Sequence, residues 1–101
     1  MDNEARNVIT GVTGSGFEFS VDVRAISDIR TVRKIGKMFE AGQNEQQQIC
    51  HALDAYELIL GADQVIALEE HIRKMNDGYC TAEDFESEVT EIIRTVNPVK
   101  N

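Results

Sequence analysis

The feature that most constrains the fold is the helical spacing of apolar residues over most of the chain. From residue 28 to residue 96, apolar side chains recur every three or four positions, in four stretches that glycines separate. An α-helix turns once in about 3.6 residues, so this spacing places the apolar side chains of each stretch on one face. The sequence therefore predicts four amphipathic helices, at about residues 28–40, 45–60, 64–75 and 82–96.

Capping residues indicate where these helices begin and end. Ser27, Asp63 and Thr81 have the short polar side chains that favour helix N-termini, and Asp84 follows Thr81 in a near capping box. The predicted stops are Gly42, Gly61, Gly78 and the dipeptide Asn97-Pro98. The apolar residues that define the four faces are Ile29, Val32, Ile35 and Phe39; Ile49, Leu53, Tyr56 and Leu60; Val65, Leu68, Ile72 and Met75; and Phe85, Val89, Ile92 and Val96.

A short β-hairpin is predicted before the helices. The stretch "FEFSVDV" alternates apolar and polar residues, with Phe17, Phe19, Val21 and Val23 on one face. The β-rich stretch "NVITGV" precedes it, and "TGSG" between them supplies glycines for a turn. We expect strands at about 7–12 and 17–23. Because a lone hairpin is marginal in water, this one must pack on helices or pair with another subunit.

Length and composition bound the class of protein. The chain has 101 residues, of which 42% are hydrophobic and 28% are charged, as is usual for a globular domain. We expect a mainly α fold: a compact bundle of about four helices with a small N-terminal β-hairpin. One domain is expected at residues 7–97, between an N-terminal tail at 1–6 and a C-terminal tail at 98–101.

The net charge of −8 disfavours nucleic acid as the main partner, because nucleic-acid binders usually carry the opposite sign. No apolar run is long enough to span a bilayer, and the polar N-terminus is no secretory signal, so we expect a cytoplasmic protein that does not bind membranes. Cys50 and Cys80 share no CxxC motif and are expected to be buried or half-buried thiols rather than a disulfide.

No pattern in the sequence indicates catalysis or a cofactor. Cys50 and His51 are adjacent, and adjacent residues of a helix point about 100° apart, which makes a poor catalytic dyad. The stretch "GVTGSG" lacks the Lys-Ser/Thr of a phosphate-binding loop. We therefore expect a protein that is not an enzyme, with no catalytic residues and no cofactor.

The stretch "NDGYCTAED" resembles the end of a calcium-binding EF-hand loop. If Gly78 takes position 6 of such a loop, Asp77 and Asp84 fall at positions 5 and 12, where oxygen ligands belong. Positions 1 and 3 would then be Arg73 and Met75, a cation and a thioether, which are unsuitable for calcium. We favour a structural turn with no metal and keep an EF-hand-like calcium-binding module as an alternative.

Charge is distributed unevenly along the chain. Arg30, Arg33, Lys34 and Lys37 fall at helical spacing on one face of the first predicted helix. From residue 38 to residue 91 there are thirteen acids and two bases, and the fourth predicted helix is the most acidic, with Glu83, Asp84, Glu86, Glu88 and Glu91. The basic face is either a solvated surface or a contact for the acidic helix of another copy. The second interpretation implies a head-to-tail assembly, a ring or an open spiral.

The order of these elements resembles the tail assembly chaperones of long-tailed siphophages, which are often found in prophages. The resemblance covers about residues 16–96. The motifs that carry it are the aromatic-rich strand "GFEFSVD", Leu60-Gly61, Asp63-Gln64, "LEEHIR" from Leu68 to Arg73, and Asp77-Gly78 before the last capped helix. The opening "NVITGVTGSG" is longer than the family pattern.

The resemblance implies a non-enzymatic chaperone in the cytoplasm of a bacterial host. Such proteins bind the tape-measure protein and tail-tube subunits while the tail is built, self-associate into spirals around the client, and are absent from the mature virion. Many are also made in a longer, frameshifted form with a C-terminal extension, and this chain would be the short form.

A chaperone needs adaptable apolar surface, and Met and aromatic residues suit that purpose, although the same residues could equally lie in the core. The candidate residues for contact with a client or with another copy are Met38, Phe39, Tyr56, Met75 and Tyr79, together with the charged residues Arg30, Arg33, Lys34, Lys37, Glu83 and Glu86. The remaining alternative is a small regulatory or adaptor protein of a mobile element, which salt-sensitive binding in a gel-shift assay would indicate.

Overall fold

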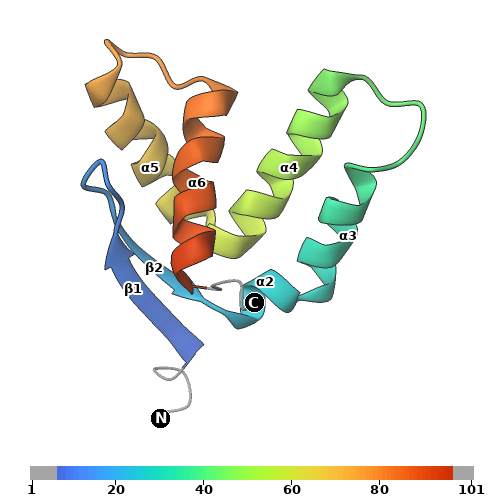
Figure 1. The fold of residues 1–101 in the computed structure, drawn as a ribbon, viewed down its shortest axis with the longest axis horizontal. Coiled ribbons are helices and arrows are strands. Elements are labelled where there is room, and N and C mark those ends of the chain that lie inside the picture. Colours follow the sequence, from blue (N-terminus) through green and yellow to red (C-terminus); the bar gives the residue numbers. More distant parts are fainter. Residues whose placement is uncertain (1–6, 97–101) are drawn as a thin grey trace.

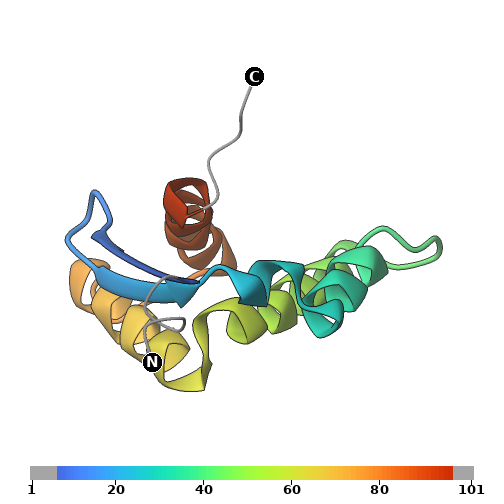
Figure 2. The ribbon, with the colours of Figure 1, turned by 90° about the horizontal axis from the view of Figure 1, so that it is seen from below.

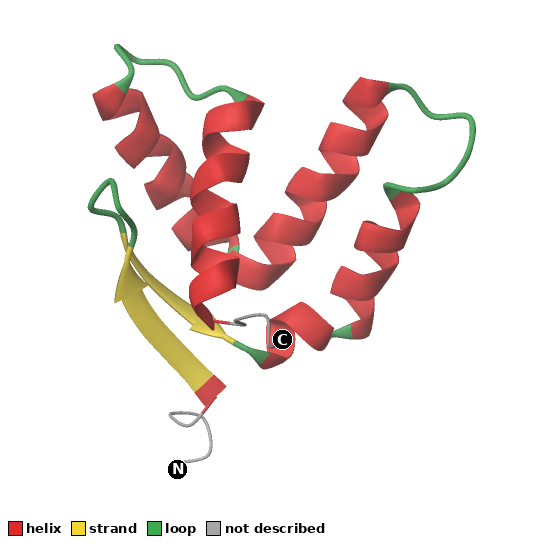
Figure 3. Cartoon of the chain, viewed as in Figure 1, coloured by secondary structure: helices red, strands yellow, loops and turns green. Residues whose placement is uncertain are grey.

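A computed structural model describes residues 7–96 and shows a mainly helical molecule with one two-stranded antiparallel hairpin, which confirms the predicted fold class (Figure 1). The tails predicted at 1–6 and 98–101 lie outside the described residues. The hairpin and helices α5 and α6 form one arm of the molecule, and α3 and α4 form the other, with α2 near the base (Figure 3). Within the described part, no helix has the length and apolar character needed to cross a membrane.

The hairpin pairs β1 (Val8–Val12) with β2 (Glu18–Asp22), as predicted. Its register sets Ile9 opposite Val21 and Gly11 opposite Phe19. Phe19 and Val21 are buried while Glu18 and Ser20 are exposed, so the predicted alternation is confirmed. The ring of Phe19 lies directly over Gly11, where a Cβ atom would come within 2.7 Å of Phe19 Cζ. Only glycine leaves room for that close packing between the two strands.

Helices anchor the hairpin along its length. The carboxamide of Gln64 on α5 accepts a hydrogen bond from the backbone N–H of Ser20 (2.8 Å) and donates one to its carbonyl oxygen (3.0 Å). At the turn, Gly14 N–H donates to Glu91 Oε2 of α6 (2.7 Å), and Ser15 Oγ lies 3.0 Å from His71 Nε2 of α5. The hairpin therefore packs on helices of its own chain, which is one of the two arrangements that its marginal stability allows.

The first predicted helix is two helices in the structure. A short helix α2 (Arg24–Ser27) precedes α3 (Ile29–Lys37). The prediction of Ser27 as the N-cap was wrong: Ser27 ends α2, and the side chain of Asp28 caps α3 by accepting from Arg30 N–H at 2.8 Å. The helix ends at Lys37 rather than at residue 40. Gly42 therefore lies in the following loop, with a φ of 87°.

Helices α4 (Glu45–Leu60) and α5 (Ala62–Met75) are joined by the single residue Gly61. The bounds of α4 match the prediction, and a capping box between Asn44 and Gln47 fixes its start. The prediction of Asp63 as the cap of α5 was wrong, because Gly61 takes that position and Asp63 lies within the first turn. An acidic residue in the first turn still has a favourable interaction with the helix dipole.

Helix α6 (Ala82–Val96) has the predicted bounds and the predicted buried face. Its cap is Thr81, whose Oγ1 accepts from Asp84 N–H at 3.0 Å. The carboxylate of Asp84 does not complete a capping box, because its Oδ2 accepts a hydrogen bond from Asn76 Nδ2 (2.8 Å) instead. The predicted apolar face, Phe85, Val89, Ile92 and Val96, is entirely buried.

The core lies in the arm that contains the hairpin. Side chains of α5 and α6 pack there against one face of the hairpin and against the C-terminal end of α4. The core residues are Phe17, Phe19, Val21, Ile59, Leu60, Leu68, Ile72, Phe85, Val89, Ile92 and Val96. Helix α3 lies outside this cluster and packs on α4 at the far side of the molecule (Figure 2). Its one buried residue is Thr31, whose Oγ1 donates to the carbonyl of Ala25 at 2.7 Å.

Candidate interaction surfaces

The outward face of α3 is apolar and exposed. Ile29, Val32 and Ile35 were predicted to share a face, and they do, but the structure leaves that face in solvent: Ile29 is 61% exposed and Val32 is 49% exposed. Phe39, just after the helix, is 77% exposed. We call Ile29, Val32, Ile35 and Phe39 the α3 face. A row of large apolar side chains outside any core is unusual on a monomeric protein and is typical of a contact with another protein.

The predicted basic residues lie beside the α3 face on the same helix, and two of them form ion pairs within the chain. Arg30 Nε lies 3.1 Å from Asp28 Oδ1, and Lys34 Nζ lies 3.2 Å from Asp54 Oδ2 of α4. The Arg30 guanidinium holds the pKa of the Asp28 carboxyl below its usual value. Arg33 forms no ion pair with a described residue, and the same is true of Lys37. These two bases therefore carry the positive charge that remains available on α3.

Helices α4 and α6 diverge toward one end (Figure 1). Residues of both helices line a cleft between them. It has a volume of about 510 Å³. Ile49, Leu53 and Tyr56 of α4 provide apolar lining, and Met38 also lines the cleft. The acidic residues along it are Glu45, Glu83 and Glu86. No lysine or arginine is among the described residues that line the cleft, so it is an apolar groove with an acidic rim.

Tyr56 and Glu86 hold the two walls of the cleft together. Tyr56 Oη donates a hydrogen bond to Glu86 Oε2 at 3.1 Å, and the Tyr56 ring lies 6.4 Å from that of Phe85, between centroids. Burial raises the pKa of Tyr56 to about 12, and the negative charge and hydrogen bond of Glu86 add to the shift. The contact therefore joins α4 to α6 as long as Tyr56 is protonated.

The walls of the cleft include residues that were predicted to share one apolar face of the second helix. Ile49, Leu53, Tyr56 and Leu60 share a face of α4, but only Leu60 is buried. The other buried residues of α4 are Ala52, Ala55 and Ile59. They lie on a face of the helix that adjoins the face of Ile49, Leu53 and Tyr56. Sequence reasoning missed Ile49 and Leu53 as site residues because an apolar stripe on a helix usually faces a core. It missed Glu45 and Ala82 because no sequence pattern brings these two residues together at the cleft.

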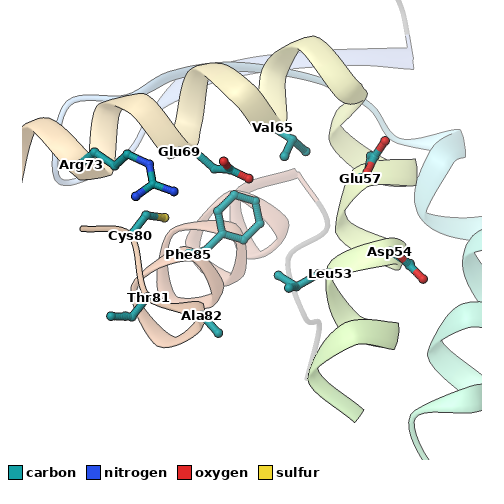
Figure 4. A pocket seen from close by; sticks show the side chains of 10 residues that line it. All are labelled: Leu53, Asp54, Glu57, Val65, Glu69, Arg73, Cys80, Thr81, Ala82 and Phe85. Carbon is teal, nitrogen blue, oxygen red and sulfur yellow. The ribbon is translucent and has the colours of Figure 1, made fainter. Parts of the chain in front are cut away.

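A smaller hollow of about 230 Å³ lies between α4, α5 and α6 and shares Leu53 and Ala82 with the cleft (Figure 4). Cys80 lines it beside Phe85. Burial raises the pKa of the Cys80 thiol, and the nearby charge of Glu69 raises it further, so this thiol is a weak nucleophile at neutral pH. Cys80 is half-buried as predicted, whereas Cys50 is exposed, which contradicts the prediction.

The turn that resembled an EF-hand loop is a hydrogen-bonded helix end. Gly78 N–H donates to the carbonyl of Arg73 at 2.7 Å, and the Arg73 side chain donates back to the Gly78 carbonyl at 3.0 Å. Gly78 has a φ of 93°, which suits the end of a helix. Within residues 7–96, no three His, Cys, Asp or Glu side chains lie close enough together to hold a metal ion.

The structure sorts the predicted site residues into three places. Met38, Tyr56, Glu83 and Glu86 line the cleft together. The four bases and Phe39 belong to α3 and its end, outside the cleft. Met75 and Tyr79 are exposed at the turn between α5 and α6 and do not line the cleft.

No protein family matches the chain, and neither a curated protein nor a solved structure is significantly similar to it.

Proposed function

We propose that the protein is a tail assembly chaperone of a long-tailed phage or prophage, in its short form. It associates with copies of itself and with its longer, frameshifted form, and it binds the tape-measure protein and tail-tube subunits while the tail is built. It acts in the cytoplasm of the bacterial host, has no enzymatic role and leaves the particle before the virion is complete. The order of helices, strands and turns in the sequence supports this proposal.

The single observation that carries the proposal is the exposure of the α3 face on the arm opposite the core. The exposed side chains of Ile29, Val32 and Phe39 contribute little to the stability of the isolated chain. Their burial against another protein would stabilise a complex. A chaperone of this kind has to cover apolar helices of a long client that would otherwise aggregate. An amphipathic helix of a client can lie against such a face or in the acidic cleft. Many copies then multiply weak single contacts.

The test is co-expression of the chain with the tape-measure protein encoded in the same genome. We expect the wild-type chain to co-purify with the tape-measure protein and to increase its soluble fraction severalfold. Val32→Asp adds a charge to the α3 face at a position that is 49% exposed, so the fold survives and retention of the client falls. The matched control is Ile66→Asp, since Ile66 is an exposed residue of α5 outside both surfaces.

Circular dichroism of both variants confirms that they are folded. If the tape-measure protein is equally soluble without the chain and never co-purifies with it, the proposed function is wrong. Equal loss of the client by Val32→Asp and Ile66→Asp would show that the α3 face is not the binding surface.

A further inference from the structure

We propose that the α3 face of one copy of the chain seats in the cleft between α4 and α6 of the next copy. This inference rests on the self-association that forms part of the proposed function. It identifies the two surfaces that meet and the residues that recognise each other.

The shapes of the two surfaces correspond. Along α4 the apolar wall of the cleft consists of Ile49, Leu53 and Tyr56, which are four and three positions apart and extend over about 10 Å of helix. On α3, Ile29, Val32 and Ile35 are spaced three apart over a similar length. An apolar helix face that lies in a groove of matching length is a recurring mode of protein recognition. The exposed fractions of these α3 residues leave them free to enter such a groove.

The charges of the two surfaces are opposite. Arg33 lies beside Ile29 at the edge of the α3 face, and Lys37 lies one turn beyond Arg33. Neither base has an ionic partner among the described residues. The rim of the cleft carries Glu45, Glu83 and Glu86, with no base among its described lining residues. Seating α3 in the cleft brings these bases close to the acids. The net charge of −8 opposes association in general, so an attractive contact requires this local pairing.

The places of the two surfaces in the fold determine the kind of assembly. Helix α4 lies between α3 and α6 in the view of Figures 1 and 3, and the cleft lies between α4 and α6. The four residues of the α3 face are not among those that line the cleft. Each chain thus has one α3 face and one cleft, and in the structure the exposed α3 face does not occupy the cleft of its own chain. Two unlike surfaces produce a head-to-tail contact, which leaves a free surface at each end and continues into a ring or an open filament.

The experiment mixes two variants that each lack one surface. Val32→Asp damages the α3 face and leaves the cleft intact, whereas Leu53→Lys damages the cleft and leaves the α3 face intact. Sedimentation velocity should show that wild-type protein forms assemblies larger than a dimer and that each variant alone is monomeric. A mixture in equal amounts should form a dimer of twice the chain mass and nothing larger, because only one functional α3 face and one functional cleft remain per pair.

A second cleft variant, Glu45→Lys with Glu83→Lys, changes only exposed residues and replaces Leu53→Lys if that variant does not fold. Ile66→Asp is the matched control and should assemble like the wild type. The proposal is overturned if the mixture stays monomeric, if Leu53→Lys alone still dimerises through two α3 faces, or if Val32→Asp alone still associates through its cleft.

A wild-type chain that is monomeric at every concentration would also overturn the proposal, because copies of the chain would then not associate. No client is present in this experiment. Failure of the client to co-purify in co-expression would therefore refute client binding without affecting this result. Failure of the mixture would refute the contact between copies without affecting client binding.

Discussion

Tyr56 is the residue at which the two walls of the cleft meet. Its ring packs near Phe85 of α6 and its hydroxyl donates to Glu86 of the same helix. Ionisation of the phenol would place a second negative charge beside the Glu86 carboxylate in a half-buried position. The width of the cleft therefore depends on a contact that requires a protonated Tyr56.

This contact predicts an unusual titration. The chain has two tyrosines, so the Tyr79→Phe variant leaves Tyr56 as the only phenol. We expect its ultraviolet absorbance to report a pKa of about 12, well above the ordinary value of 10.0. Because the pKa in the folded state is raised, the stability that the contact contributes is fully present below pH 10 and is lost as the pH rises toward 12.

Circular dichroism of the same samples shows whether the helices remain folded during the titration. A midpoint near pH 10 with the helices intact would mean that Tyr56 is solvated and that the contact with Glu86 does not hold the cleft.

Single capping residues show what a sequence can and cannot indicate at this scale. Thr81 was predicted correctly because it is the only strong capping residue directly before its helix. Ser27 and Asp28 are adjacent and both suitable, and the choice between them depends on the short helix α2, which ends at Ser27. Gln64 gives no signal at all, since its hydrogen bonds to Ser20 join residues 44 positions apart.

Among the elements, the junction between α4 and α5 depends on one residue. Gly61 has a φ of 88° and a ψ of 151°, a backbone conformation that is essentially restricted to glycine. As the single residue between the two helices, it sets the angle at which α5 leaves α4. The angle between the two arms therefore depends on Gly61.

Two glycine substitutions should have opposite effects on stability. Gly61→Ala forces a side chain into that conformation and should lower the free energy of unfolding by about 1–3 kcal/mol. Gly36→Ala lies within α3, where a Cβ atom meets nothing within 4 Å, and should raise it by about 0.5–1 kcal/mol through better helix propensity. Urea unfolding of both variants measures the difference. If Gly61→Ala were as stable as Gly36→Ala, the backbone conformation described for Gly61 would be contradicted.

The sequence predicted which apolar residues share a face of each helix, but not what each face contacts. In α6 the residues that share the apolar face also lie in the core. For α3 the periodicity is equally clear, yet the face lies in solvent. In α4 the small residues Ala52 and Ala55 are buried while larger ones line the cleft. Periodicity is a property of one helix, whereas burial depends on which helices pack together.

One pair of substitutions tests this difference between α3 and α6. Ile92 is fully buried in α6, so Ile92→Ala should reduce the free energy of unfolding by about 2–5 kcal/mol. Ile29 is mostly exposed on α3, so Ile29→Ala should change it by less than about 0.5 kcal/mol in dilute protein. Urea unfolding at low protein concentration measures the free energy of unfolding of both variants. A large loss at Ile29 would mean that the α3 face is buried within the single chain.

For the whole molecule, the decisive property is the separation of two unlike surfaces. The sequence showed that basic residues gather in one stretch and acidic residues in the remainder. It did not show that each charged surface adjoins exposed apolar side chains, because helical spacing does not distinguish an apolar face in the core from one in solvent. In the structure the α3 face and the acidic cleft share no residue, so one chain carries two separate surfaces.

The measurement that tests this account most directly is light scattering of the wild-type chain over a range of protein and salt concentrations. At low salt we expect an average mass well above the 11.3 kDa of one chain, rising with protein concentration. Added salt screens the contact between the bases of α3 and the acids of the cleft, so the mass should fall toward that of the monomer. A mass of 11.3 kDa under every condition, or an assembly that salt leaves unchanged, would contradict the account.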